Sequence, residues 1–170
     1  MHDETTLLAA LDALGIAYAN TPHDAVFTVE ESESLHAAIP GLHTKNLFLK
    51  DKDGRFWLVT VEAHARVDLK ALPAAIGAKK VSFGKAEDVQ RLLGVTPGSV
   101  TPLAAINDAD GSVTVVLDTA VAEAPRANVH PLHSGATLGL AGADLVTALT
   151  AWGHAPTIVA IPSPPLDKQD

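Results

Sequence analysis

The chain has 170 residues, of which 47% are hydrophobic and 19% are charged. That length is enough for one well-buried domain and too short for a second full one. The chain contains no cysteine, which excludes disulfide bonds, thiolate nucleophiles and thiolate metal ligands. No apolar run is long enough to cross a bilayer, and residues 1–4 lack the basic start of a signal peptide. We therefore expect a cytoplasmic protein with no membrane partner.

The charges are distributed unevenly along the chain, although the formal net charge is −8. Residues 1–44 hold seven acidic residues and no Lys or Arg, whereas residues 45–91 hold ten of the twelve basic residues against six acidic ones. Net negative charge argues against nucleic-acid binding, but a locally basic segment can meet a polyanion on one face. Two interpretations stay open: a nucleic-acid-binding face, or a solvated run of charges without a function.

The first part of the chain is predicted to alternate helices with short strands. Leucines at helical spacing from Leu7 to Leu14 indicate an amphipathic helix that Gly15 ends. Aromatic and β-branched residues on both sides of the Asp51–Gly54 turn indicate a β-hairpin. The elements expected here are a helix over 3–14, strands over 18–20 and 25–28, a helix capped by Thr28 or Ser32 that ends at Pro40, and hairpin strands over 47–49 and 55–61.

The second part continues the alternation, with no internal repeat and no low-complexity linker. The expected helices cover 68–75, 86–93 and 143–152, the expected strands cover 81–83, 113–117 and 157–161, and a loop covers 95–102. Residues 162–170 form a Pro-rich polar segment that we expect to be a flexible tail. The pattern predicts a single α+β domain over residues 1–170.

Lys45 and Asn46 are the first candidate functional residues, because they come directly before the apolar strand 47–49. Polar side chains at that position are expected to face whatever cleft the sheet presents. The alternative is a solvated strand start with no chemical role.

Several common chemistries lack their sequence signatures. There is no Gly-x-Ser-x-Gly elbow, no Walker loop and no Gly-x-Gly-x-x-Gly fingerprint. The acidic turn Asn107–Gly111 lacks the remainder of an EF-hand calcium loop, and His130 and His133 have no third ligand at a familiar metal spacing. We therefore expect no metal and no cofactor, and a metal-dependent hydrolase using the two histidines is the competing enzyme hypothesis.

Three segments follow one another in an order and spacing that resemble a known family. They are Thr44-Lys45-Asn46 at the hairpin, Gly98-Ser99-Val100-Thr101-Pro102 in a loop, and Asn128-Val129-His130-Pro131-Leu132. Together they resemble the YbaK/prolyl-tRNA synthetase-associated family of aminoacyl-tRNA editing domains, and most closely its stand-alone alanyl-tRNA(Pro) deacylase branch. The resemblance covers nearly the whole chain.

The resemblance implies an α+β fold with a mixed, partly barrel-like sheet flanked by helices. It also implies hydrolysis of mischarged tRNA(Pro), with alanine as the amino acid removed, by water attack on the 3′-terminal ester. The partners implied are the acceptor end of that tRNA and prolyl-tRNA synthetase. The catalytic residues implied are Lys45, Gly98 and His130, and the substrate-binding residues are Asn46, Ser99, Thr101 and Pro102.

The chemistry of an activated ester fits these residue types. Hydrolysis requires a placed water, a stabilised oxyanion and a fixed ribose, and no strong nucleophile. Lys45 is then a cation that binds phosphate or carbonyl oxygen, while backbone N–H groups near Gly98 are candidate oxyanion donors. We expect Leu47 and Ile106 in the wall of a small apolar amino-acid pocket. The alternative function is a non-catalytic module that binds nucleic acid or a synthetase.

Overall fold

The computed structural model describes residues 1–26 and 28–166. Its α-helices are α1 (Glu4–Ala13), α2 (Val29–Ala38), α3 (Leu72–Ile76), α4 (Ala86–Leu93), α5 (Thr119–Ala122) and α6 (Gly142–Ala151). Its strands are β1 (Ala19–Pro22), β2 (Leu42–Asp51), β3 (Phe56–Glu62), β4 (Val81–Phe83), β5 (Val113–Asp118), β6 (Ala127–Val129), β7 (Ala136–Leu140) and β8 (Thr157–Val159). Two 3₁₀ turns, η1 (Pro97–Ser99) and η2 (Pro102–Asn107), lie between α4 and β5.

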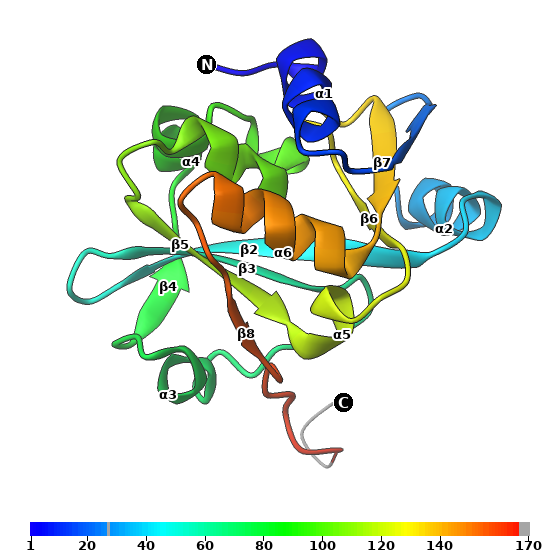
Figure 1. Ribbon diagram of the computed structural model, residues 1–170. Helices are drawn as coiled ribbons and strands as arrows, with labels where there is room; N and C mark the ends of the chain where they lie inside the picture. Colours follow the sequence, from blue (N-terminus) through cyan, green and yellow to red (C-terminus); the bar gives the residue numbers. More distant parts are fainter. Residues whose placement is uncertain (27, 167–170) are drawn as a thin grey trace.

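The strands form one mixed sheet in the order β1-β7-β6-β2-β3-β5-β8, with β4 pairing β2 off this path. The β2–β3 hairpin is antiparallel, whereas β3–β5, β5–β8 and β2–β6 are parallel. The predicted α+β class, a mixed sheet flanked by helices, is confirmed, although the sheet is not closed into a barrel (Figure 1).

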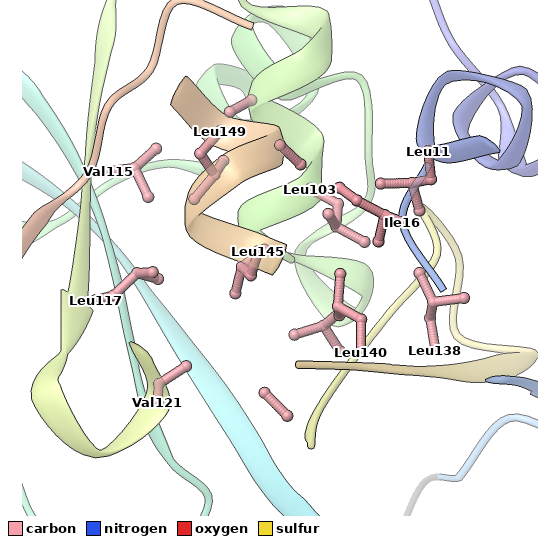
Figure 2. Close-up of a cluster of buried hydrophobic side chains, with 14 of the residues drawn as sticks. Leu11, Ile16, Leu103, Val115, Leu117, Val121, Leu138, Leu140, Leu145 and Leu149 are labelled. Carbon is pink, nitrogen blue, oxygen red and sulfur yellow. The ribbon is translucent and has the colours of Figure 1, made fainter. Parts of the chain in front are cut away.

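Helices cover both faces of the sheet. Alternate residues of β3 point to opposite sides, so that Trp57 and Val59 pack with α3 while Leu58 packs with α4. The largest cluster lies under α6, whose Leu145 and Leu149 meet leucines of η2 and β7 and valine and leucine of β5 (Figure 2). These packed layers fix the central strand β2 from both sides.

Strand β2 is the element that positions the candidate residues. One of its edges pairs with β3, and the other pairs with β6 at residues 42–43 and with β4 at residues 49–51. Between those stretches the described strands leave residues 44–47 of β2 without a partner on that edge. Lys45 and Asn46 are therefore inside a ten-residue strand. The prediction that they precede the strand is wrong, because the strand begins at Leu42.

Helices with clear local signals are confirmed close to their predicted bounds. The Asp3 side chain accepts a hydrogen bond from the Thr6 N–H and caps α1, and Thr28 caps α2 through the Glu31 N–H. Gly94, in the left-handed region with φ of +68°, ends α4.

Other expected elements differ from the structure. Residues 25, 26 and 28 lie in no strand, and Phe27 lies outside the described residues. The helix predicted from Asp68 begins only at Leu72, because the Asp68 carboxylate instead accepts the N–H groups of Lys70 and Ala71 in a preceding turn. Strands β6 and β7 were not predicted. Residues 167–170 of the expected tail also lie outside the described part of the chain.

The acidic turn before β5 has a structural role. The buried Asp108 carboxylate accepts hydrogen bonds from the Ser112 and Val113 N–H groups at 3.1 and 2.8 Å, and the Asp108 backbone carbonyl bonds His154 Nε2 at 2.8 Å. Both carboxylate oxygens of Asp108 accept hydrogen bonds that form the turn. This arrangement does not favour a calcium site at Asn107–Gly111.

Within residues 1–26 and 28–166, no helix has the length and apolar composition needed to cross a membrane.

Candidate active site

A cavity of about 500 Å³ lies where α2 faces the beginning of β2 and the β6–β7 connection. That volume is in the range of small-molecule sites, roughly 300–1,000 Å³. Aliphatic side chains and a group of polar ones share its wall. The lining residues are Val26, Thr28, Val29, Ser32, Glu33, Leu35, His36, His43, Thr44, Lys45, Ala63, His64, Asn128, Val129, His130 and Thr137.

Lys45 lines this cavity, whereas its neighbour Asn46 does not. Successive side chains of a strand point to opposite faces, and the two residues pair across the hairpin with Val61 and Thr60 respectively. No carboxylate of the described residues forms an ion pair with Lys45. Its ammonium is therefore a cation directed at the cavity and free to meet an anionic or carbonyl oxygen.

Asn46 ties the Gly98–Pro102 loop to the sheet. Its Nδ2 donates to the Val100 carbonyl at 2.9 Å, and its Oδ1 accepts from the Thr60 hydroxyl at 2.6 Å. Thr60 is fully buried, so this pair of hydrogen bonds lies in a protected environment. The side chain of Asn46 thus positions the loop and does not face the cavity.

The loop residues themselves lie outside the cavity lining. Ser99 and Thr101 are buried, and their hydroxyls hydrogen-bond locally: Ser99 Oγ to Thr96 Oγ1 at 3.2 Å, and Thr101 Oγ1 to the Leu103 N–H at 3.3 Å. Pro102 is buried at the start of η2. Gly98 is exposed, and a Cβ at that position would meet no heavy atom within 4 Å. The protein's own packing therefore does not require glycine there.

His130 follows β6 and lines the cavity. Burial lowers the pKa of His130 below its ordinary value, an effect that the Ala136 backbone partly opposes. Its Nδ1 is buried with no hydrogen-bond partner among the described residues. A neutral imidazole with one unused ring nitrogen can donate to or accept from a bound ligand, depending on its tautomer.

The three segments singled out in the sequence converge around β2. The Thr44 hydroxyl donates to the Asn128 carbonyl at 2.7 Å, which joins β2 to the His130 segment. Leu132, which adopts a φ of +74°, packs against the cluster that contains Val100. The Asn46–Val100 hydrogen bond completes the connection to the Gly98–Pro102 loop. Lys45 and His130 share the cavity, and the loop is held directly behind it by Asn46.

Sequence reasoning missed the polar group at the α2 side of the cavity, formed by Glu33, His36, His43 and His64. His36 stacks on His43 with ring centroids 4.1 Å apart, and His64 Nε2 lies 3.4 Å from Glu33 Oε1. Only the Glu-x-x-His spacing within α2 was visible in the sequence; the other two histidines come from β2 and from the segment after β3.

The two expected wall residues also lie elsewhere. Leu47 packs against the cluster under α3 and Ile106 against the cluster under α6, and neither lines the cavity. The aliphatic part of the wall comes instead from the α2 region and from Ala63 and Val129.

The profile of the aminoacyl-tRNA editing domain family matches residues 23–148, which include every element that forms the cavity. The chain belongs to the aminoacyl-tRNA editing domain family. This editing domain is thus an enzyme of the aminoacyl-tRNA deacylase class, which hydrolyses the ester between an amino acid and a tRNA.

Relatives of this editing domain match it over most of their length. Prolyl-tRNA editing protein ProX of Acetoanaerobium sticklandii is 36% identical over 155 residues, which cover 91% of this chain and 94% of that protein. Prolyl-tRNA synthetase associated domain-containing protein 1 of Bos taurus is 39% identical over 154 residues, which cover 88% and 90%. The crystal structure of a candidate trans-editing enzyme for prolyl-tRNA synthetase shares the fold, with a TM-score of 0.70 at 19% identity over 96% of this chain and 99% of that one.

The competing metal hypothesis for His130 and His133 is not favoured by the geometry of this editing domain. His133 Nε2 bonds Glu4 Oε2 at 2.8 Å, and its Nδ1 accepts the Gly135 N–H at 3.0 Å. Both ring nitrogens are therefore in use. Within the described ranges, the group whose ligand atoms lie close enough to hold a metal is a different one, Glu33, His36 and His64.

Proposed function

We propose that this editing domain acts in trans on mischarged tRNA(Pro) and that alanine is the amino acid it removes. The observation that carries the proposal is the shared cavity, which a cation, Lys45, and a neutral imidazole, His130, line together with aliphatic and polar side chains. The names of the relatives, a prolyl-tRNA editing protein and a prolyl-tRNA synthetase associated protein, support tRNA(Pro) as the substrate.

Alanine follows from the limits of a synthetase pocket. A proline pocket cannot strongly reject a smaller apolar amino acid, because a missing methylene changes binding by only about 1–3 kcal/mol. A second site that admits small side chains corrects such errors. The wall residues Val26, Leu35 and Val129 are apolar and branched, which suits a methyl side chain better than a hydroxyl or thiol.

In the proposed reaction a water molecule attacks the ester carbonyl carbon. The carbon–oxygen bond to the terminal ribose then breaks, the ribose oxygen takes a proton, and the free amino acid and the deacylated tRNA leave. Lys45 binds the terminal phosphate or the carbonyl oxygen, which holds the ester in place and stabilises negative charge. Backbone N–H groups near Gly98 lie outside the cavity lining, so they donate to the substrate only where it extends beyond the cavity. None of these steps requires a covalent intermediate.

His130 has a binding role in this proposal. Since burial keeps its imidazole neutral near pH 7, one ring nitrogen is available to hydrogen-bond the ribose hydroxyl or the attacking water. The acceptor end of the tRNA is the partner of the site, and prolyl-tRNA synthetase is the source of the mischarged substrate.

A deacylation panel tests the proposal. Purified protein is incubated with alanyl-, seryl-, cysteinyl- and prolyl-tRNA(Pro), and we expect alanine to be released fastest and proline to be retained. Lys45→Ala should lower the rate by about a hundredfold or more, the usual cost of removing an oxyanion-stabilising group. Lys70→Ala is the matched control, because Lys70 is exposed and lines neither this cavity nor the smaller basic pocket near β2.

Folded protein that hydrolyses none of the four substrates would contradict the proposal. If such protein still binds tRNA, the alternative of a non-catalytic nucleic-acid-binding module is favoured. Faster release of serine or cysteine would leave the deacylase class intact and contradict the assignment of alanine.

A further inference from the structure

We propose that Glu33, His36 and His64 form a binding site for a divalent transition-metal ion of the Zn²⁺ type at the mouth of the cavity. One nitrogen of each imidazole and one carboxylate oxygen lie within 4.8 Å of one another. All three side chains also line the cavity. Among the described residues, no hydrogen bond or ion pair joins them to Lys45 or His130. The site has no role in the proposed hydrolysis.

The three groups come from two elements that converge. Glu33 and His36 are three residues apart on α2, so both project from the same face of that helix. His64 follows β3, and its backbone N–H donates to the Glu62 carboxylate at 2.9 Å, which fixes the start of that segment. A bound ion would therefore connect α2 to the end of β3 across the cavity mouth.

The spacing of the ligand atoms is close to that of a tetrahedral zinc site. With zinc–ligand distances of about 2.0–2.2 Å, two ligand atoms lie roughly 3.3–3.5 Å apart. The Glu33 Oε1–His64 Nε2 distance is already 3.4 Å. The remaining distances between ligand atoms are at most 4.8 Å, so the side chains move closer together when an ion binds. Two imidazoles and one carboxylate leave a fourth position for water or a ligand.

A second observation, the environment of the His36 ring, independently supports a ligand at this site. Its Nδ1 is buried and has no hydrogen-bond partner among the described residues, although a buried polar atom is normally paired. A neutral imidazole is the form that binds a metal, and stacking on His43 orients the ring.

Imidazole nitrogen together with a carboxylate oxygen selects the metal class. This donor set suits Zn²⁺, Ni²⁺, Cu²⁺ and Co²⁺ and is a poor set for Mg²⁺ or Ca²⁺, which prefer oxygen ligands.

The test uses the tag-free full chain, stripped with EDTA and returned to metal-free buffer. Titration with Zn²⁺ by calorimetry should give one bound ion per chain, and titration with Co²⁺ should give the absorption bands of a low-symmetry site. His64→Ala and Glu33→Gln should each weaken Zn²⁺ binding by at least about tenfold, since even an outer-shell partner contributes about 10–100-fold. His2→Ala is the control, because His2 is an exposed histidine outside the group.

Hydrogen exchange gives a readout that depends on the bridging geometry. Zn²⁺ should slow amide exchange within residues 29–38 of the wild-type protein and should have no effect on that segment in the His64→Ala variant. Undiminished binding by both variants, or no binding by folded wild-type protein, would overturn the proposal. Neither measurement uses deacylation, so failure of the metal site and failure of the proposed editing function are distinguishable.

Discussion

At the scale of single residues, the contrast between Lys45 and Asn46 determines how the site is built. The two are adjacent in β2 and therefore point to opposite faces of the sheet. Lys45 faces the cavity, while Asn46 bonds the Val100 carbonyl and the Thr60 hydroxyl behind it. Consecutive residues of one strand thus have different positions: Lys45 lines the cavity, and Asn46 holds the loop in place. The sequence led us to expect both side chains in one cleft, but only Lys45 lines the cavity.

Asn46→Ala should lower both stability and activity. It leaves the Thr60 hydroxyl and the Val100 carbonyl without their partner, and each unpaired buried group costs about 1–3 kcal/mol. We expect the free energy of unfolding, measured in urea, to fall by about 2–4 kcal/mol. Deacylation should fall as well, because the Gly98–Pro102 loop loses its attachment to β2.

Thr60→Val is the matched control for that change. It removes the hydroxyl bond to Asn46 but leaves the Asn46–Val100 hydrogen bond in place. Stability should fall while the deacylation rate of the folded fraction stays near wild type. Equal loss of activity in the two variants, at a temperature where both are folded, would show that Asn46 acts only through general stability.

At the scale of elements, the η1–η2 loop is notable because its central glycine has no structural reason to be glycine. The space around a Gly98 Cβ is empty, and its backbone does not adopt a positive φ. We propose that a ligand approaches the backbone closely at this position, where a side chain would obstruct it.

Gly98→Ala should accordingly reduce deacylation without reducing stability. A glycine-to-alanine change at an unstrained position raises the free energy of unfolding by about 0.4–1 kcal/mol, through the entropy of the unfolded chain. Ser99→Ala serves as the control, because it removes a hydroxyl and keeps the backbone N–H groups of the loop. Unchanged activity in Gly98→Ala, measured by single-turnover hydrolysis, would remove this loop from the site.

The elements also show where sequence reasoning succeeds. Helices α1, α2 and α4 carry their own caps and stops, such as Asp3, Thr28 and Gly94, so their bounds follow from local residues. The strands β6 and β7 are short and include Asn128 and Gly139, and their pairing with β2 and β1 depends on residues far away in the chain. The position of Lys45 beside the hairpin and the spacing of His130 and His133 point to these residues in the sequence, whereas their catalytic roles come from the resemblance to a family.

The cluster of histidines illustrates the part of a site that a sequence conceals. His64 lies 28 residues beyond His36 in the chain, and nothing in the intervening hairpin indicates that it returns to α2. The Asn46–Val100 bond is equally hidden, since it joins positions 54 residues apart. Contacts between residues so far apart in the chain depend on sheet register and packing, which a local sequence pattern does not predict.

At the scale of the whole molecule, charge and cavity are arranged along the same strand. Lys50, Lys52 and Lys80 surround a smaller cavity of about 220 Å³ near the far end of β2, whereas α2, beside the main cavity, carries three glutamates within Val29–Ala38. A tRNA backbone is expected to contact the basic end while its acceptor terminus reaches Lys45. The net negative charge elsewhere discourages non-specific coating of nucleic acid.

The stability of the whole molecule should decrease in mild acid because of buried imidazoles. The pKa values of His130 and His36 lie below the ordinary value of 6.5, mainly through burial. As pH falls below 6.5, the unfolded chain therefore takes up these protons before the folded one, and the free energy of unfolding decreases. One such group contributes a slope of at most about 1.4 kcal/mol per pH unit.

His130→Asn should flatten this dependence, because it removes the more deeply buried of the two imidazoles. Urea unfolding at several pH values between about 5 and 7.5 measures the slope. The His2→Asn variant, changed at an exposed histidine, should keep the wild-type slope. If the His130→Asn variant has the same slope as the wild type, His130 binds a proton as readily in the folded protein as in the unfolded chain. Protonation of this imidazole in mild acid would then not lower the free energy of unfolding. In that case the neutral hydrogen-bonding role proposed for His130 would be restricted to pH values above its ordinary titration range.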